Sequence, residues 1–180
     1  MELTLKIIVI LTMLQRIYEL RLSKNNEAQL IDKGAKIIPE KNYIFMVLLH
    51  SSWIVLLLYL AFYQPIMTSP LYFSIGLILF FTGQALRILA IKTLGERWST
   101  RIVVLPKAPV IKKGIFNFIR HPNYLGVILE IAFLPIAFKA FSAALIFSLI
   151  NGVILYFRIK LEESSLSEFN NYFQEFKSNG

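Results

Sequence analysis

The sequence of 180 residues contains no cysteine. Disulfide bonds, thiolate metal sites and cysteine nucleophiles are therefore excluded, and we expect no metal centre. The sequence also has no G-x-G-x-x-G motif, which argues against a Rossmann-type nucleotide-binding fold. It shows neither internal repeats nor low-complexity stretches, and its length suits a single folded unit.

Apolar side chains are abundant, at 56% of the residues, and the mean hydropathy is positive. A soluble domain of this size has too little polar surface to cover so much apolar side chain. Five apolar runs are long enough, or nearly so, to cross about 30 Å of hydrocarbon as helices. These runs are 3–22, 43–63, 71–91, 124–138 and 141–157. The sequence therefore predicts an all-α integral membrane protein of about five transmembrane helices, forming one domain over residues 1–180.

Lysine and arginine are unevenly distributed along the chain. Most of them lie in segments 15–42 and 92–123 and in the tail after residue 157, whereas segment 63–70 has none. The positive-inside rule then predicts a plasma-membrane protein with its N-terminus outside the cell, and with both long loops and the C-terminus in the cytoplasm. The net charge of +8 is explained by this topology and by contact with membrane lipids, so we expect no nucleic-acid partner.

The tail after the last apolar run has a helical pattern of its own. Leu166, Phe169, Phe173 and Phe176 recur at helical spacing between residues 162 and 176, with polar residues elsewhere. This pattern predicts a C-terminal amphipathic helix that lies at the membrane interface or packs under the bundle.

The most informative motif is the stretch from Arg120 to Gly126, followed by Glu130. Pro122 suits a first helical position, and the free N–H groups of an opening helical turn favour an anionic group. The simpler alternative is that His121 and Asn123 only form an ordinary helix cap. Glu130 lies about two turns deep in the membrane, where a carboxylate is costly unless it faces a cavity or a partner, so it is a functional candidate.

Several other polar residues could have either a functional or a purely structural role. Arg158 and Glu162, followed by Glu163, come directly after the last apolar run, and the bland alternative is an exposed i, i+4 salt bridge. Arg87, near the end of the third run, is a site candidate unless it extends to the lipid headgroups. His50 is most simply a buried hydrogen-bonding group, with catalysis as the alternative.

Taken together, several of these motifs resemble the isoprenylcysteine carboxyl methyltransferase family of membrane enzymes. The resemblance covers roughly residues 76–176 and rests on Leu94-Gly95 with Trp98-Ser99, on Gly114-Ile115-Phe116, on the Arg120–Gly126 motif with Glu130, and on Arg158 with Glu162-Glu163. The N-terminal part resembles a bacterial branch whose members methylate alkylpyrones and phenolic lipids. It shares Arg16, Glu19, Gly34-Ala35, His50 and Trp53, among others, with that branch.

The resemblance implies an S-adenosylmethionine-dependent O-methyltransferase with a lipophilic substrate, either a prenylated cysteine carboxylate or the hydroxyl of an alkylpyrone or phenolic lipid. Residues 71–180 would form the cofactor-binding core, and residues 1–70 the substrate side. The residues that would bind the cofactor are His121, Pro122, Tyr124, Gly126, Glu130, Glu162 and Glu163. Arg158 would lie near the cofactor and could pair with its carboxylate or orient the glutamates. As catalytic residues we expect Arg158, Arg87 and His50, the last two as aids to a hydroxyl acceptor.

Three alternatives belong to other classes. A sterol-reductase-like enzyme that uses NADPH has a related C-terminal pattern, but five spans leave little room for a larger nicotinamide pocket. A small transporter would show inverted repeats and broken helices, which are not visible in the sequence. A non-enzymatic membrane adaptor would not need Glu130 or the Arg120–Gly126 motif.

Overall fold

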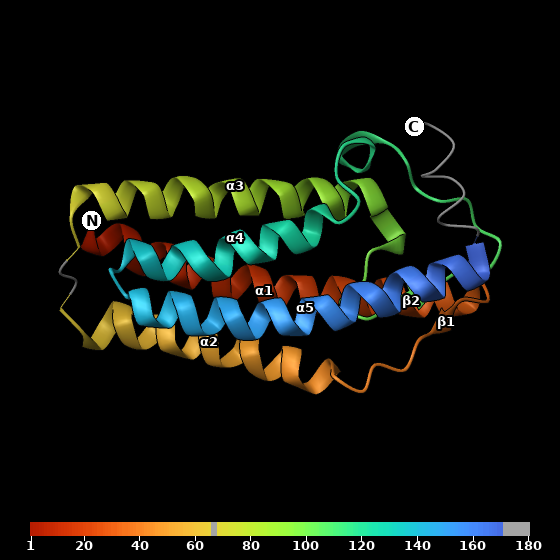
Figure 1. Ribbon diagram of the computed structural model, residues 1–180, viewed down its shortest axis with the longest axis horizontal. Coiled ribbons are helices and arrows are strands. Elements are labelled where there is room, and N and C mark those ends of the chain that lie inside the picture. Colours follow the sequence, from red (N-terminus) through yellow and green to blue (C-terminus); the bar gives the residue numbers. More distant parts are fainter. Residues whose placement is uncertain (66–67, 171–180) are drawn as a thin grey trace.

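The computed structural model describes residues 1–65 and 68–170, and in these residues five long helices pack side by side in a bundle (Figure 1). The helices are α1 (Glu2–Asp32), α2 (Tyr43–Tyr63), α3 (Pro70–Leu94), α4 (Pro122–Ala137) and α5 (Phe141–Asn170). Short 3-10 turns η1 (Gly95–Arg97) and η2 (Gly114–Asn117) lie between α3 and α4. The predicted all-α class is therefore confirmed.

The helix boundaries follow the local sequence. α3 starts at Pro70 after Ser69, whose hydroxyl accepts a hydrogen bond from the Tyr72 N–H (3.4 Å), as expected of a helix cap. α1 continues ten residues beyond the predicted apolar run and ends just before Gly34, whose φ of +87° is easy only for glycine.

The C-terminal amphipathic helix differs from the prediction. Up to Asn170 it is a direct continuation of α5 rather than a separate element, because residues 158–170 contain no glycine or proline that would interrupt the helix. The remainder of the predicted helix, with Phe173 and Phe176, lies outside the described residues.

Three of the helices are long and apolar enough to cross a membrane, namely Tyr43–Tyr63, Pro70–Arg97 and Phe141–Asn170. α4 is apolar but shorter, and α1 carries several charges. Large apolar side chains such as Val55, Ile78 and Leu149 point outward, as they would towards lipid. Membrane integration is thus supported, whereas the count of five spans and their orientation stay predictions.

The tightest contact in the bundle is the one between α3 and α4. A Cβ atom built on Gly76 would lie 2.6 Å from the backbone nitrogen of Ala137, and one on Gly83 would lie 2.7 Å from the Gly126 carbonyl oxygen. Small residues let two membrane helices approach this closely without a hydrophobic driving force between them. The close approach brings residues of α3 directly against Glu130 of α4.

At one end of the bundle, here called the loop end, the two long loops are joined to each other and to α1 (Figure 1). β1 (Lys36–Ile37) pairs antiparallel with β2 (Val103–Val104). The Asn26 side chain donates to the Trp98 carbonyl (2.7 Å), and the Ser23 hydroxyl accepts from the Thr100 N–H (2.9 Å). These contacts fix the loop between α3 and α4 over the ends of the helices.

A surface ion pair adds to this arrangement. Lys33, at the end of α1, pairs with Glu96 of η1. Because both side chains are more than half exposed, the pair contributes little to stability.

The glycine contacts predict a site-specific loss of stability. Gly76→Ala should lower the unfolding free energy by about 1–3 kcal/mol, because the added methyl group overlaps the Ala137 backbone. The measurement is thermal unfolding in detergent. Gly152→Ala is the matched control, since a Cβ at Gly152 meets nothing within 4 Å, and it should unfold at or above the temperature of the native protein. Equal melting temperatures for the two variants would contradict the packing argument.

Candidate active site

A cavity of about 510 Å³ lies beneath the loop end, and all five helices contribute to its wall. Its size is within the range of sites that bind cofactors and drug-sized ligands. Most of the wall is apolar, with Ile17, Leu20, Met46, Val47 and Ile54 among the lining residues. Two groups of charged side chains interrupt this apolar wall, one nearer the loop end and one deeper in the bundle.

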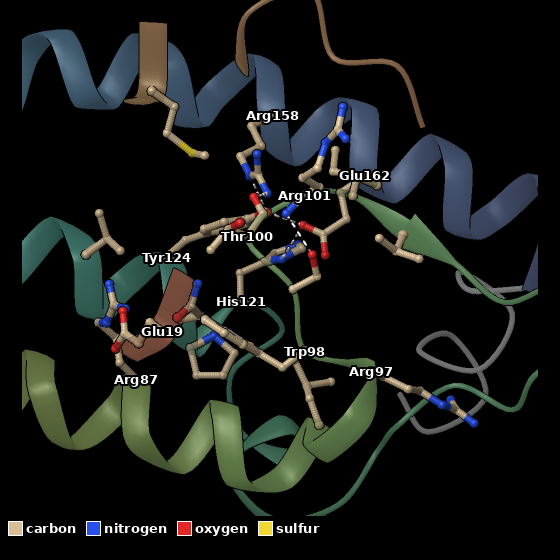
Figure 2. A pocket seen from close by; sticks show the side chains of 18 of the residues that line it. Glu19, Arg87, Arg97, Trp98, Thr100, Arg101, His121, Tyr124, Arg158 and Glu162 are labelled. Atoms are coloured by element: carbon tan, nitrogen blue, oxygen red, sulfur yellow. Dashed lines mark hydrogen bonds and ion pairs between the residues drawn. The ribbon is translucent and has the colours of Figure 1, made fainter. Parts of the chain in front are cut away.

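Arg158 is the centre of the group nearer the loop end (Figure 2). Its guanidinium donates to the Tyr124 hydroxyl (2.9 Å), to the Glu40 carboxylate (2.5 Å) and to the Thr100 carbonyl (2.8 Å). The Tyr124 hydroxyl in turn donates to Glu162 (2.5 Å). The expected bland interpretation, an exposed Arg158–Glu162 salt bridge, is therefore wrong, since the Arg158 side chain is 7% exposed and pairs with Glu40.

His121 belongs to the same group, which we call the outer cluster: Glu40, Arg120, His121, Tyr124, Arg158, Glu162 and Glu163. His121 Nε2 donates to Glu163 (3.0 Å), and Nδ1 lies 4.0 Å from Glu162. Its ring stacks on Tyr124 with centroids 5.5 Å apart. Although His121 occupies the N-cap position of α4, its side chain makes no capping hydrogen bond, so the cap interpretation is also wrong.

The deeper group is a ring of four charges, which we call the inner ion ring: Arg16 and Glu19 on α1, Arg87 on α3 and Glu130 on α4. Arg16 pairs with Glu19 (3.0 Å) and with Glu130, while Arg87 pairs with Glu19. Arg87 Nε also lies 3.3 Å from Glu130 Oε1, at ion-pair distance but without the alignment of a hydrogen bond. Two positive and two negative charges therefore balance each other inside the bundle.

The sequence comparisons match the region that carries most of these residues. Residues 75–168, slightly more than half of the chain, match the family model described as "Isoprenylcysteine carboxyl methyltransferase (ICMT) family". The chain belongs to this family. The resemblance inferred from the motifs is thereby confirmed, and with it membership in a family of membrane methyltransferases.

Two bacterial relatives extend the comparison across nearly the whole chain. The uncharacterized protein YpbQ of Bacillus subtilis is 29% identical over 164 residues, covering 91% of this chain and 97% of that protein. An uncharacterized protein of Haemophilus influenzae is 32% identical over 157 residues, covering 84% of this chain and 88% of its own length. No solved structure matches the chain significantly.

This ICMT-family chain brings most of the predicted site residues to one cavity. The predicted residues that line it are His50, Arg87, His121, Pro122, Tyr124, Arg158 and Glu162. Arg87 does not extend to the lipid headgroups, because its side chain is 4% exposed and bound to Glu19. The alternative that we considered for it is therefore wrong.

The other three predicted cofactor residues lie behind the cavity wall. Gly126 is at the α3–α4 contact, where an added Cβ would lie 2.6 Å from the Gly83 carbonyl oxygen. Glu130 is fully buried in the inner ion ring, and Glu163 holds His121 from the side of α5. A role for these residues in cofactor binding stays a prediction.

Three partners in the site were not singled out from the sequence, namely Arg16, Glu19 and Glu40. Glu40, in the loop between α1 and α2, accepts from the Ile102 N–H (3.0 Å) as well as from Arg158. Glu19 appeared only among residues shared with a bacterial branch, although it is 5% exposed and pairs with both arginines of the ring. Glu19 could have been noticed because it is a carboxylate within an apolar run. Nothing in the sequence around Glu40 sets it apart from an ordinary surface glutamate.

The inner ion ring predicts a strong dependence of stability on charge balance. Glu130→Gln should lower the unfolding free energy by about 3–5 kcal/mol, because it leaves a buried positive charge unmatched. The measurement is thermal or denaturant unfolding in detergent. Glu163→Gln is the comparison, since its partner Arg120 is half exposed and it should cost far less.

A double variant checks that charge balance is the cause. Arg16→Gln combined with Glu130→Gln removes one charge of each sign, so its loss of stability should be smaller than the sum of the two single losses. Strict additivity of the losses would count against a coupled ring.

Proposed function

We propose that the protein is a membrane-embedded S-adenosylmethionine-dependent O-methyltransferase that acts on a lipophilic acceptor. The observation that carries this proposal is that the motif residues of a methyltransferase family, His121, Tyr124, Arg158 and Glu162, gather on the wall of one largely apolar cavity. Charged groups suit a polar cofactor, and the apolar wall suits a lipid chain.

The residues of the outer cluster fit S-adenosylmethionine chemically. Glu162 offers a carboxylate to hydroxyl or ammonium groups, and Tyr124 offers an aromatic face. Arg158 uses three of its five N–H groups on Glu40, Thr100 and Tyr124, which leaves two for a carboxylate.

Two further buried atoms on the cavity-lining residues have unmet hydrogen-bonding capacity. Asn123 Oδ1 and Trp98 Nε1 have no hydrogen-bond partner among the described residues. A buried donor or acceptor left in this state costs free energy, which a bound polar ligand would relieve. This agrees with a site that is completed by a ligand.

S-adenosylmethionine supplies a methyl group on a sulfonium, which is open to direct in-line attack by oxygen. The protein's own task is to align the attacking oxygen and to exclude water, since alignment accounts for much of the barrier in such a displacement. The outer cluster is suited to hold the polar reactant rigidly because each charged side chain has at least one fixed partner. The acceptor would be a prenylated cysteine carboxylate or the hydroxyl of an alkylpyrone or phenolic lipid.

The first test is calorimetric titration of the detergent-purified protein with S-adenosylhomocysteine, with NADPH as a parallel ligand. Saturable binding of S-adenosylhomocysteine alone is the expected result. Binding of NADPH alone would overturn the proposal in favour of the sterol-reductase-like alternative, and binding of neither would favour a non-enzymatic protein.

Tyr124 provides a variant that tests the outer cluster. Tyr124→Phe removes the hydroxyl that joins Arg158 to Glu162, so the dissociation constant for S-adenosylhomocysteine should rise about tenfold or more. Tyr59→Phe is the matched control, because the Tyr59 hydroxyl lies on α2 and, among the described residues, accepts a hydrogen bond only from the exposed Gln64. Equal affinities of the two variants would exclude Tyr124 from the cofactor site.

A further inference from the structure

His50, on α2, lines the cavity with one ring nitrogen that the protein does not use. Its Nδ1 lies 2.9 Å from the Met46 carbonyl oxygen, one turn earlier in the same helix. A carbonyl oxygen only accepts hydrogen bonds, so the proton of the neutral ring is on Nδ1 and Nε2 carries a lone pair. No hydrogen bond to Nε2 occurs among the described residues, which leaves this nitrogen available to a ligand.

The other basic groups on the described part of the cavity wall belong to the two groups of charged side chains. Glu19 is held by both arginines of the inner ion ring and by Gln15. Glu162 accepts from the Tyr124 hydroxyl (2.5 Å). Both nitrogens of His121 face carboxylates, at 3.0 and 4.0 Å. His50 Nε2 differs from these groups because it lies on the apolar part of the wall, with Met46, Val47 and Ile54 of the same helix as its lining neighbours, and no described residue donates a hydrogen bond to it.

The need for such a base depends on the acceptor. A carboxylate is already ionised at neutral pH and attacks without losing a proton, whereas a phenol or enol must lose one. A base on the cavity wall therefore has a use only with a hydroxyl acceptor.

The charge balance of the inner ion ring favours the same class of acceptor. Its two arginines are matched by two carboxylates, so an acceptor carboxylate beside it would be a third negative charge in a largely apolar cavity. A hydroxyl enters uncharged and avoids that desolvation cost. Arg16, which lines the cavity and is 16% exposed, can then stabilise the oxyanion as it forms.

We propose that His50 Nε2 is the general base of the reaction and that the acceptor is a lipid with a phenolic or enolic hydroxyl. This inference rests on the proposed function. The hydroxyl proton passes to Nε2, and an oxygen lone pair forms the new bond to the methyl carbon. The carbon–sulfur bond of the sulfonium donor breaks with its electron pair going to sulfur. The products are a methyl ether, a neutral thioether and a protonated His50, which returns its proton to water.

The test compares two probe acceptors with the same long alkyl chain, an alkylphenol and its more acidic nitro-substituted analogue. His50→Gln should slow methylation of the alkylphenol by roughly 100-fold or more, the usual contribution of a general base. It should slow methylation of the nitrophenol only a few-fold at a pH where that probe is already ionised in water. Ser52→Ala is the matched control, because Ser52 is exposed on the same helix and should leave both rates unchanged.

A second readout needs neither turnover nor a methyl donor. The nitrophenolate absorbs visible light, so titration of the probe with protein below the pKa of the probe reports its ionisation in the site. The native protein and Ser52→Ala should increase the ionised fraction of bound probe, whereas His50→Gln should not. Because the measurement on the native protein involves no variant, it tests the inference even if His50→Gln fails to fold.

The outcomes separate this inference from the proposed function. Suppose that the native protein binds S-adenosylhomocysteine. If His50→Gln then slows methylation of both probes by the same factor, or slows neither, His50 is not the base. Bound nitrophenol that stays un-ionised in the native protein, or preferential methylation of a long-chain carboxylate, would also overturn the inference. If the native protein does not bind S-adenosylhomocysteine and methylates no probe, the proposed function itself fails, and the inference falls with it.

Discussion

The inner ion ring is the interaction on which the arrangement of the bundle depends. Four charged side chains from α1, α3 and α4 are removed from water, and each is compensated only while all three helices stay in place. An unmatched charge in such surroundings is far more costly than a missing apolar contact. The glycine contacts between α3 and α4 serve the same arrangement, because they allow Arg87 to reach Glu130 across a very short distance.

The site also depends on the part of the chain before the matched family region. Arg16, Glu19, Glu40 and His50 all precede residue 75, yet they pair with residues of the family motifs or line the same cavity as those residues. The predicted substrate side (residues 1–70) and cofactor core (residues 71–180) are therefore not separate structural units, although they can still have different roles. The charged contacts cross it in both the outer cluster and the inner ion ring.

Sequence patterns predicted the features that depend on residues close together in the chain. Apolar runs located the five helices, Pro122 marked the start of α4, and the Arg120–Gly126 motif pointed to the end of the bundle where the cavity lies. Pairings between distant residues were beyond these patterns. Glutamate is common on protein surfaces, so Glu40 did not stand out in its loop, and only the folded chain brings it to Arg158, 118 residues away. Arg87 looked free to reach the headgroups for the same reason, since its partner Glu19 belongs to another helix.

The internal neutrality of the inner ion ring has a consequence for chemistry in this cavity. Polar groups that are already fixed by partners need not reorganise when charge shifts in a reacting molecule, and in a largely apolar cavity each of them acts more strongly than in water. A ring with zero net charge adds no strong preference for an ionised ligand. It still presents the Arg16 guanidinium to any negative charge that develops. Such surroundings favour an acceptor that enters neutral and becomes charged only as the reaction proceeds, which is how the proposed lipid hydroxyl would behave on losing its proton to a nearby base.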